Sequence, residues 1–328
     1  LALQIEPTQM ERRRILTELY VQAGPDQLDK AVREAQAQLR LAPYRLQNYR
    51  MLLRLYKQME QYDRAWCVCA ALSFLEKADA DERQFFEQYR PKGIVKAKSR
   101  LTNEDWLKHV AHPGGDLLLG KIFETIAGAV RAVKVRPHKH YDLRGKDKRD
   151  PRTDASPATR AFGYIAQVLN VPIPEVYVRK DVRFPLLYAI TDPPATVLAE
   201  KALAQISQRE AAFLIAKHLA HYRGEHYLKW VLPATDELKL FLTAAIRLVK
   251  RDSRPPDDLA SRVDEATLVL ERGLDGMAME ALAKIVKRFV ETQAAVDLKR
   301  WSRDVELTAC RAGLLVAGDL ESAARMIR

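Results

Sequence analysis

Apolar residues recur at helical spacing over most of this chain. Segments 236–250, 259–270 and 277–289 each carry apolar side chains three or four positions apart, which predicts amphipathic helices. A long apolar segment at 117–133 and an acid-rich helix start at 102–105 add two more helices. The pattern therefore predicts a chain in which helices dominate.

Three short runs of β-branched and aromatic residues interrupt the helical pattern. Segments 174–178 and 186–190 alternate between apolar and polar or small positions, and 196–198 is a third such run. Alternation with a period of two is typical of strands that have one buried face. We therefore predict a mainly α fold with a small β-sheet, an α+β arrangement.

The helix after these strands carries most of the candidate chemistry. Ser207 and Glu210 form a capping box at the start of a helix predicted over 207–221. Downstream, Glu306 lies in a second apolar-periodic helix, which we expect to end near Gly313.

The first quarter of the chain contains an internal repeat. Segment 28–35 recurs as segment 62–69, an offset of 34 residues, with an apolar residue, an aspartate, a basic residue and an alanine in the same order. This offset resembles the period of tetratricopeptide repeats, which implies stacked helical hairpins. The implied helix pairs span 9–41 and 46–76.

Segment 215–222, Ile-Ala-Lys-His-Leu-Ala-His-Tyr, follows the strands as an active-site helix would. Residues from about 163 to 328 resemble the gluzincin metallopeptidases of the CAAX-processing and heat-shock-protease type. In that family a His-Glu-x-x-His helix follows a strand pair, and a later Glu-x-x-Ala-Asp helix supplies the third zinc ligand. The resemblance implies a zincin-like helical domain with a short sheet.

This chain departs from the family motif at the positions that perform its chemistry. Lys217 stands at the first zinc-ligand position and His218 at the general-base position, whereas His221 keeps the second ligand position. The resemblance places Glu306 at the third ligand position and Cys310 at the aspartate position. An ammonium group has no lone pair for a metal and repels a cation. We therefore expect a vestigial site without a cofactor, in which His221 and Glu306 bind Lys217.

A second interpretation is a hydrolase with a non-standard site. His218 would act as a base beside His221, because imidazole titrates near neutral pH. Alternatively, His218, His221 and Glu306 would bind a metal ion, with His226 as a further candidate ligand.

A third interpretation is a basic adaptor that binds nucleic acid. The chain has 54 Lys and Arg residues against 43 Asp and Glu residues, a net charge of +11. Segment 137–152 is the most charged, and we expect it to be a mobile loop or a solvated linker. Its candidate basic surface comprises Lys139, Arg144, Lys146, Lys148 and Arg149. No zinc-finger, ribonucleoprotein or helix-turn-helix motif accompanies these cations.

We predict three segments along the chain. They are tetratricopeptide-like repeats at 1–91, a helical connector with the basic loop at 92–157, and a peptidase-like domain with a lost zinc site at 158–328. Residues 3–7 echo residues 39–43, so we expect the repeats to be the end of a longer array.

The leading hypothesis is a non-catalytic protein-interaction scaffold in which the peptidase-like domain caps the repeats. We therefore expect a protein partner. No apolar run reaches the ~18 residues of a membrane span. The sequence has three cysteines, which cannot all pair, and no disulfide framework, so we expect a reducing cytoplasm.

Overall fold

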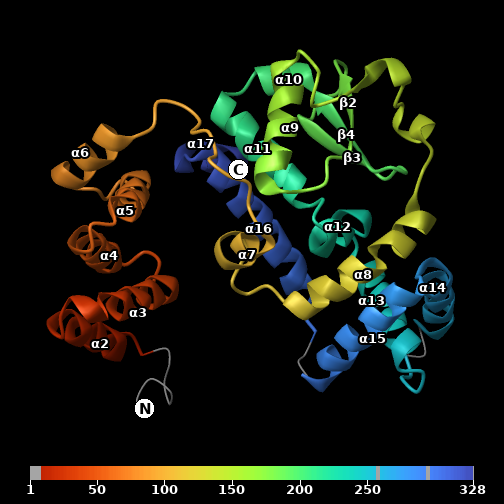
Figure 1. Ribbon diagram of the computed structural model, residues 1–328, viewed down its shortest axis with the longest axis horizontal. Coiled ribbons are helices and arrows are strands. Elements are labelled where there is room, and N and C mark those ends of the chain that lie inside the picture. Colours follow the sequence, from red (N-terminus) through yellow and green to blue (C-terminus); the bar gives the residue numbers. More distant parts are fainter. Residues whose placement is uncertain (1–8, 256–258, 293–295, 328) are drawn as a thin grey trace. The chain divides into compact units, whose positions relative to one another are not determined.

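The computed structural model describes residues 9–255, 259–292 and 296–327. Helices account for 68% of it and strands for 5%, which confirms the predicted mainly α fold with a small sheet. The chain divides into two compact units, Leu1–Gly93 and Ile94–Arg328, coloured along the sequence in Figure 1. Within the described ranges, no helix has both the length and the apolar character needed to cross a membrane.

The first unit is a series of helices in which each packs against the next. Both predicted helix pairs are present, followed by one further helix. Small side chains fill equivalent places in the two pairs: Ala31, Ala35, Ala65 and Cys69 are each at most 1% exposed. Small residues at these positions let the backbones of neighbouring helices approach closely. The helices are α2 (Met10–Gln22), α3 (Leu28–Leu41), α4 (Leu46–Gln58), α5 (Tyr62–Phe74) and α6 (Ala80–Tyr89).

Helix α6 is fastened to both helices of the second pair. Its capping box pairs Asp79 with Glu82, and the Arg50 guanidinium of α4 donates to Glu82 at 3.0 Å. The Trp66 ring of α5 stacks on Phe86, and its Nε1–H donates to the Phe86 carbonyl oxygen at 3.0 Å. Polar and aromatic contacts therefore combine to hold this last helix.

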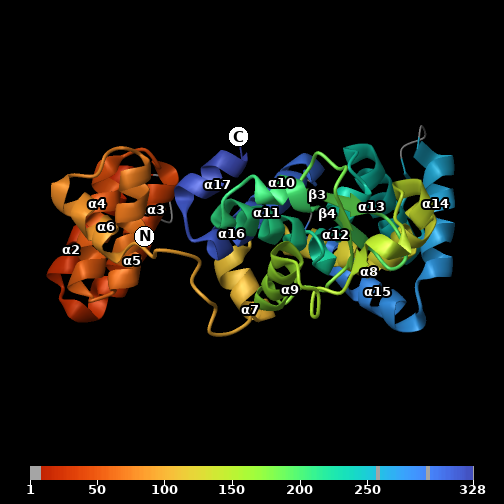
Figure 2. The ribbon, with the colours of Figure 1, turned by 90° about the horizontal axis from the view of Figure 1, so that it is seen from above.

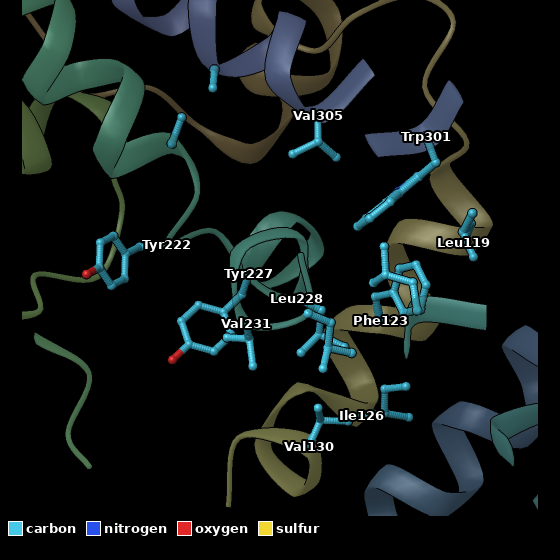
Figure 3. Close-up of a cluster of buried hydrophobic side chains, with 14 of the residues drawn as sticks. Leu119, Phe123, Ile126, Val130, Tyr222, Tyr227, Leu228, Val231, Trp301 and Val305 are labelled. Atoms are coloured by element: carbon cyan, nitrogen blue, oxygen red, sulfur yellow. The ribbon is translucent and has the colours of Figure 1, made fainter. Parts of the chain in front are cut away.

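The core of the second unit forms around α8 (Leu117–Lys134). Figure 3 shows Phe123 of α8 and Leu228 of α12 among the buried side chains, together with Trp301, whose ring centroid lies 4.6 Å from that of Phe123. The helices packed around α8 include α12 (Gly224–Val231), α13 (Thr235–Val249), α14 (Ala260–Gly273) and α15 (Gly276–Glu291).

The predicted connector at 92–157 is not a separate segment in this structure. Residues from Ile94 onward belong to the second unit, because α8 supplies fully buried side chains such as Ile122 and Ile126 to its core. Upstream of α8, Trp106 Nε1–H donates to the Leu169 carbonyl oxygen at 2.7 Å. This segment is therefore built into the domain that follows it.

A four-stranded sheet with the order β1-β2-β4-β3 lies beside helices of the second unit. β4 is central and buried at every position; it pairs in parallel with β2 and antiparallel with β3. The three predicted strands are confirmed. The strands are β1 (Lys148–Arg149), β2 (Glu175–Arg179), β3 (Leu186–Ala189) and β4 (Ala195–Ala199), and the nearby helices are α9 (Pro157–Leu169), α10 (Glu200–Ala204) and α11 (Gln208–Ala220).

The basic segment at 137–152 is mostly exposed and connects α8 to α9, as expected of a solvated linker, but it contains regular structure. It forms two 3-10 turns, His138–Tyr141 and Gly145–Asp147, and then β1, which pairs with the edge of β2. Lys148 forms an ion pair with Glu175 of β2, which helps to hold this strand in place. Backbone pairing of Lys148 and Arg149 with β2, which the local composition does not reveal, gives the end of the segment a regular structure.

Helix α16 (Leu298–Ala317) packs closely along α11, as Figure 2 shows, and α17 (Leu320–Ile327) follows it. The prediction that this helix ends near Gly313 is wrong. The helix continues to Ala317 and is capped by Gly318, whose φ of 61° suits glycine. Gly313 instead allows close packing, because a Cβ there would lie 2.7 to 2.9 Å from atoms of Phe213 on α11.

We expect Gly313→Ala to destabilise the protein by about 1–3 kcal/mol, because the added methyl group would force α11 and α16 apart. Thermal and denaturant unfolding followed by circular dichroism would measure the effect. Gly128→Ala is the matched control, since nothing lies within 4 Å of a Cβ at that exposed helical position. There the same substitution should stabilise by about 0.5–1 kcal/mol. Equal effects at the two positions would contradict this account of the packing.

Candidate functional site

The predicted site residues of α11 and α16 meet at one carboxylate. Lys217 and His221 are four positions apart and therefore share a face of α11. Lys217 Nζ lies 3.0 Å from Glu306 Oε1, and His221 Nε2 lies 3.0 Å from Glu306 Oε2. The structure thus joins three of the five predicted positions in one cluster, which links the two helices through their side chains.

The Glu306 carboxylate is held in its ionised form. The hydrogen bond from His221 and the nearby Lys217 ammonium lower the pKa of Glu306 to about 2, although partial burial opposes this effect. The three side chains differ in exposure: 7% for His221, 25% for Lys217 and 44% for Glu306. The cluster therefore has a buried histidine end and a solvent-accessible carboxylate end.

Both ring nitrogens of His221 have partners. An ionised carboxylate only accepts, so Nε2–H donates to Glu306. Nδ1 lies 3.1 Å from the Lys217 carbonyl oxygen and 3.0 Å from the Tyr188 hydroxyl. The single proton of that hydroxyl is donated to the carbonyl oxygen of His218 at 3.1 Å. His221 consequently has no ring nitrogen left free for another ligand.

His218 points into the core rather than toward solvent. It is 5% exposed, and its Nε2 lies 3.0 Å from the Thr196 hydroxyl of β4. The Tyr188 ring of β3 stacks on it at 3.8 Å, with Trp230 stacked on the other face of Tyr188 at 4.6 Å. Burial, with a smaller effect of the charge on His221, lowers the pKa of His218 well below its usual value. This neutral, covered imidazole gives no support to the hypothesis of a histidine-based hydrolase.

A second series of hydrogen bonds connects Tyr222, which follows α11, to strand β4 of the sheet. The Thr196 hydroxyl lies 2.7 Å from the Tyr222 hydroxyl, which donates to the Ala195 carbonyl oxygen at 3.0 Å. Burial raises the pKa of Tyr222 above its usual value.

Sequence reasoning missed the roles of Tyr188, Thr196 and Tyr222. The nearest signal was the aromatic and hydroxyl residues on the predicted strands and at the end of the predicted helix.

Cys310 lies at the edge of the cluster, beside Lys217, whereas His226 is bonded elsewhere. Cys310 follows Glu306 by one turn of α16, and burial raises the pKa of its thiol, although Lys217 opposes this shift. A thiol with a raised pKa is a poor nucleophile near neutral pH. His226 is 9% exposed, and its Nδ1 lies 3.1 Å from the carbonyl oxygen of Ala220. Neither side chain adds chemistry to the cluster.

The residues of the cluster do not fit a zinc ion. Zinc needs three or four lone-pair donors that converge on one point. Lys217 supplies an ammonium instead, while the Nε2 of His221 faces Glu306 and that of His218 faces Thr196. Over the part of the chain that the structure describes, no three His, Cys, Asp or Glu side chains are grouped as metal ligands would be.

No protein-family model, curated protein or solved structure matches this chain.

Stability should fall in acid because of buried histidines, and His226 allows a quantitative prediction. Burial lowers the pKa of His226 to about 4, against 6.5 for the free side chain, although the Glu225 carboxylate opposes this shift. Between these values the unfolded chain takes up a proton and the folded protein does not. His226 therefore leaves the free energy of unfolding unchanged above about pH 6.5. As the pH falls from 6.5 toward 4, protonation of this side chain in the unfolded chain lowers the free energy of unfolding.

We expect this effect to lower the free energy of unfolding by about 1–3 kcal/mol between pH 7 and pH 4.5. Denaturant unfolding at several pH values would measure it. In His226→Gln the fall over this range should be smaller than in the unsubstituted protein, whereas His140→Gln, at an exposed position, should leave it unchanged. Parallel stability curves for the unsubstituted protein and His226→Gln would contradict the prediction.

Proposed function

We propose that this chain is a non-catalytic protein-interaction scaffold whose second unit is an inactive relative of the gluzincin peptidases. One observation carries the proposal. The Lys217 ammonium binds Glu306, at the place where the resemblance to the gluzincins would put zinc. A cation that belongs to the chain thus neutralises the carboxylate that would otherwise bind the metal.

This exchange keeps the two helices linked while removing the chemistry. In the resembling peptidases, zinc ligands come from both helices, so the metal also links them. Here Lys217 and His221 of α11 bind Glu306 of α16 directly. An ammonium has no site for a water nucleophile, and His218 is buried where a general base would be needed. The cluster is therefore suited to a structural role.

The first unit supports the interaction part of the proposal. Its repeated helix pairs resemble tetratricopeptide hairpins, which bind proteins through extended surfaces. Several large aromatic side chains of this unit are exposed, including Tyr44 at 83%, Tyr62 at 57% and Tyr89 at 58%. Exposed tyrosines are frequent anchors in protein interfaces. We therefore propose a protein as the partner of this unit.

The basic segment gives weaker support to nucleic-acid binding. Arg144 lies 3.1 Å from Asp142, Arg149 lies 3.4 Å from Asp154, and Lys148 pairs with Glu175. These carboxylates compete with phosphate groups for the same cations. Lys139 and Lys146 are exposed in the same segment.

Lys217→His should create a zinc site in this protein. The new imidazole would lie one helical turn before His221 and would face Glu306, which would complete a set of three ligands with an open position for water. Elemental mass spectrometry of the protein, after zinc loading and desalting, should find about one zinc ion per chain in this variant. Lys217→Met, which removes the ammonium without adding a ligand, should bind none, and neither should the unsubstituted protein.

Two outcomes would count against the proposal. Stoichiometric zinc in the unsubstituted protein, lost in His221→Ala and accompanied by metal-dependent proteolysis of casein, would refute the inactive-peptidase function. A folded Lys217→His variant that binds no zinc would refute the equivalence between this cluster and a gluzincin metal site. Circular dichroism would establish that each variant is folded.

A further inference from the structure

A cavity of about 500 Å³ lies in the second unit, against a face of α11 that is different from the face of Lys217. Ala211, Ala212 and Ile215 of α11 line it at helical spacing. Position 217 is two residues beyond 215, which places it about 200° around the helix. The cavity is therefore separate from the cluster around Glu306.

The cavity wall is mostly apolar. Ala158 and Ala161 of α9, Leu203 of α10 and Val316 of α16 contribute to it, in addition to the residues of α11. Alanines at these positions leave space that larger side chains would fill. Ligand sites in proteins have volumes of roughly 300–1,000 Å³ and apolar walls with few polar groups. This cavity has both properties.

One carboxylate lies in the wall of the cavity, whose other polar side chains, Ser156, Tyr164 and Gln208, are uncharged types. Among the lining residues, all of which the structure describes, Glu200 is the only acidic side chain. Its Oε1 accepts a hydrogen bond from the Ser156 hydroxyl at 2.9 Å. Within the described ranges no basic side chain forms an ion pair with it, although the chain has 54 Lys and Arg residues. Its charge is thus available to a cationic group inside the cavity.

We propose that this cavity binds a small amphipathic amine. The hydrocarbon or aromatic body lies against the alanine-rich wall, and the ammonium group donates to Glu200. The proposal does not depend on the function proposed above, because it concerns a different face of α11. Glu200 also lies in the first turn of α10, where a negative charge is favourable by itself. A ligand assay separates the two roles, because the helix effect does not discriminate between ligand head groups.

The test uses the neutral fluorescent probe N-phenyl-1-naphthylamine, displaced by octylamine or by octanoate. We expect saturable binding of the probe at one site per chain. Octylamine should displace it at a concentration about tenfold or more below that of octanoate, because the carboxylate of octanoate would face Glu200. Glu200→Gln should keep the binding of the probe and remove most of this preference.

A second pair of variants locates the site. Ala211→Leu fills the cavity and should weaken probe binding about tenfold, whereas Ala281→Leu adds the same side chain at an exposed position of α15 and should leave binding unchanged. The absence of saturable binding, equal displacement by the two competitors, or equal affinity in Ala211→Leu and Ala281→Leu would each overturn the proposal. If Ala211→Leu does not fold, the displacement ratios of the unsubstituted protein and Glu200→Gln decide the question.

Discussion

The contact of the Glu306 carboxylate with Lys217 and His221 is the polar constraint that links the two helices of the candidate site. It joins α11, which lies against the sheet, to α16, which reaches the core around α8. The exposed part of this contact contributes little, since solvent-accessible ion pairs stabilise by about 0–1 kcal/mol. His221 is 7% exposed, and leaving its N–H without an acceptor would cost about 1–3 kcal/mol. The hydrogen bond from the buried His221 to Glu306 therefore contributes most of the stabilisation by this contact.

Packing and polar contacts cooperate along this helix pair. The glycine at 313 brings α16 against Phe213, and seven positions before it the carboxylate of Glu306 meets the donors of α11. On the other side of α11, the stacked rings of His218 and Tyr188 occupy the space beside β3 and β4. His218 is thus buried among the aromatic side chains beside the sheet.

Local patterns in the sequence predicted the helices and strands better than they predicted the contacts between them. The strands, the capping box at Ser207 and the helices at 117–133 and 236–250 follow from short-range periodicity, and the structure confirms them. The strand at Lys148 and the role of Gly313 could not be predicted, because they depend on the edge of β2 and on Phe213, which lie far away in the sequence. The apolar pattern at 117–133 predicted a helix, but it did not predict that this helix lies at the centre of the core.

Part of the site could also be predicted from the sequence, because some of its residues are related by local spacing. The spacing of Lys217 and His221 places both on one face of a helix, whereas the partner role of Glu306 came only from the resemblance to a known family. The contacts of Tyr188 and Thr196 with the histidines depend on the register of β3 and β4, which no local pattern records. Contacts between residues that are far apart in the sequence could therefore not be predicted from local patterns.

The most direct test of the central claim is a double-mutant cycle between Lys217→Met and Glu306→Gln, with the free energy of unfolding measured at low and high salt. If the ammonium and the carboxylate stabilise one another, the two substitutions should be coupled by about 0.2–1 kcal/mol at low salt and by less at high salt. Strictly additive effects at low salt would contradict the account, because they would show that Lys217 and Glu306 do not stabilise one another.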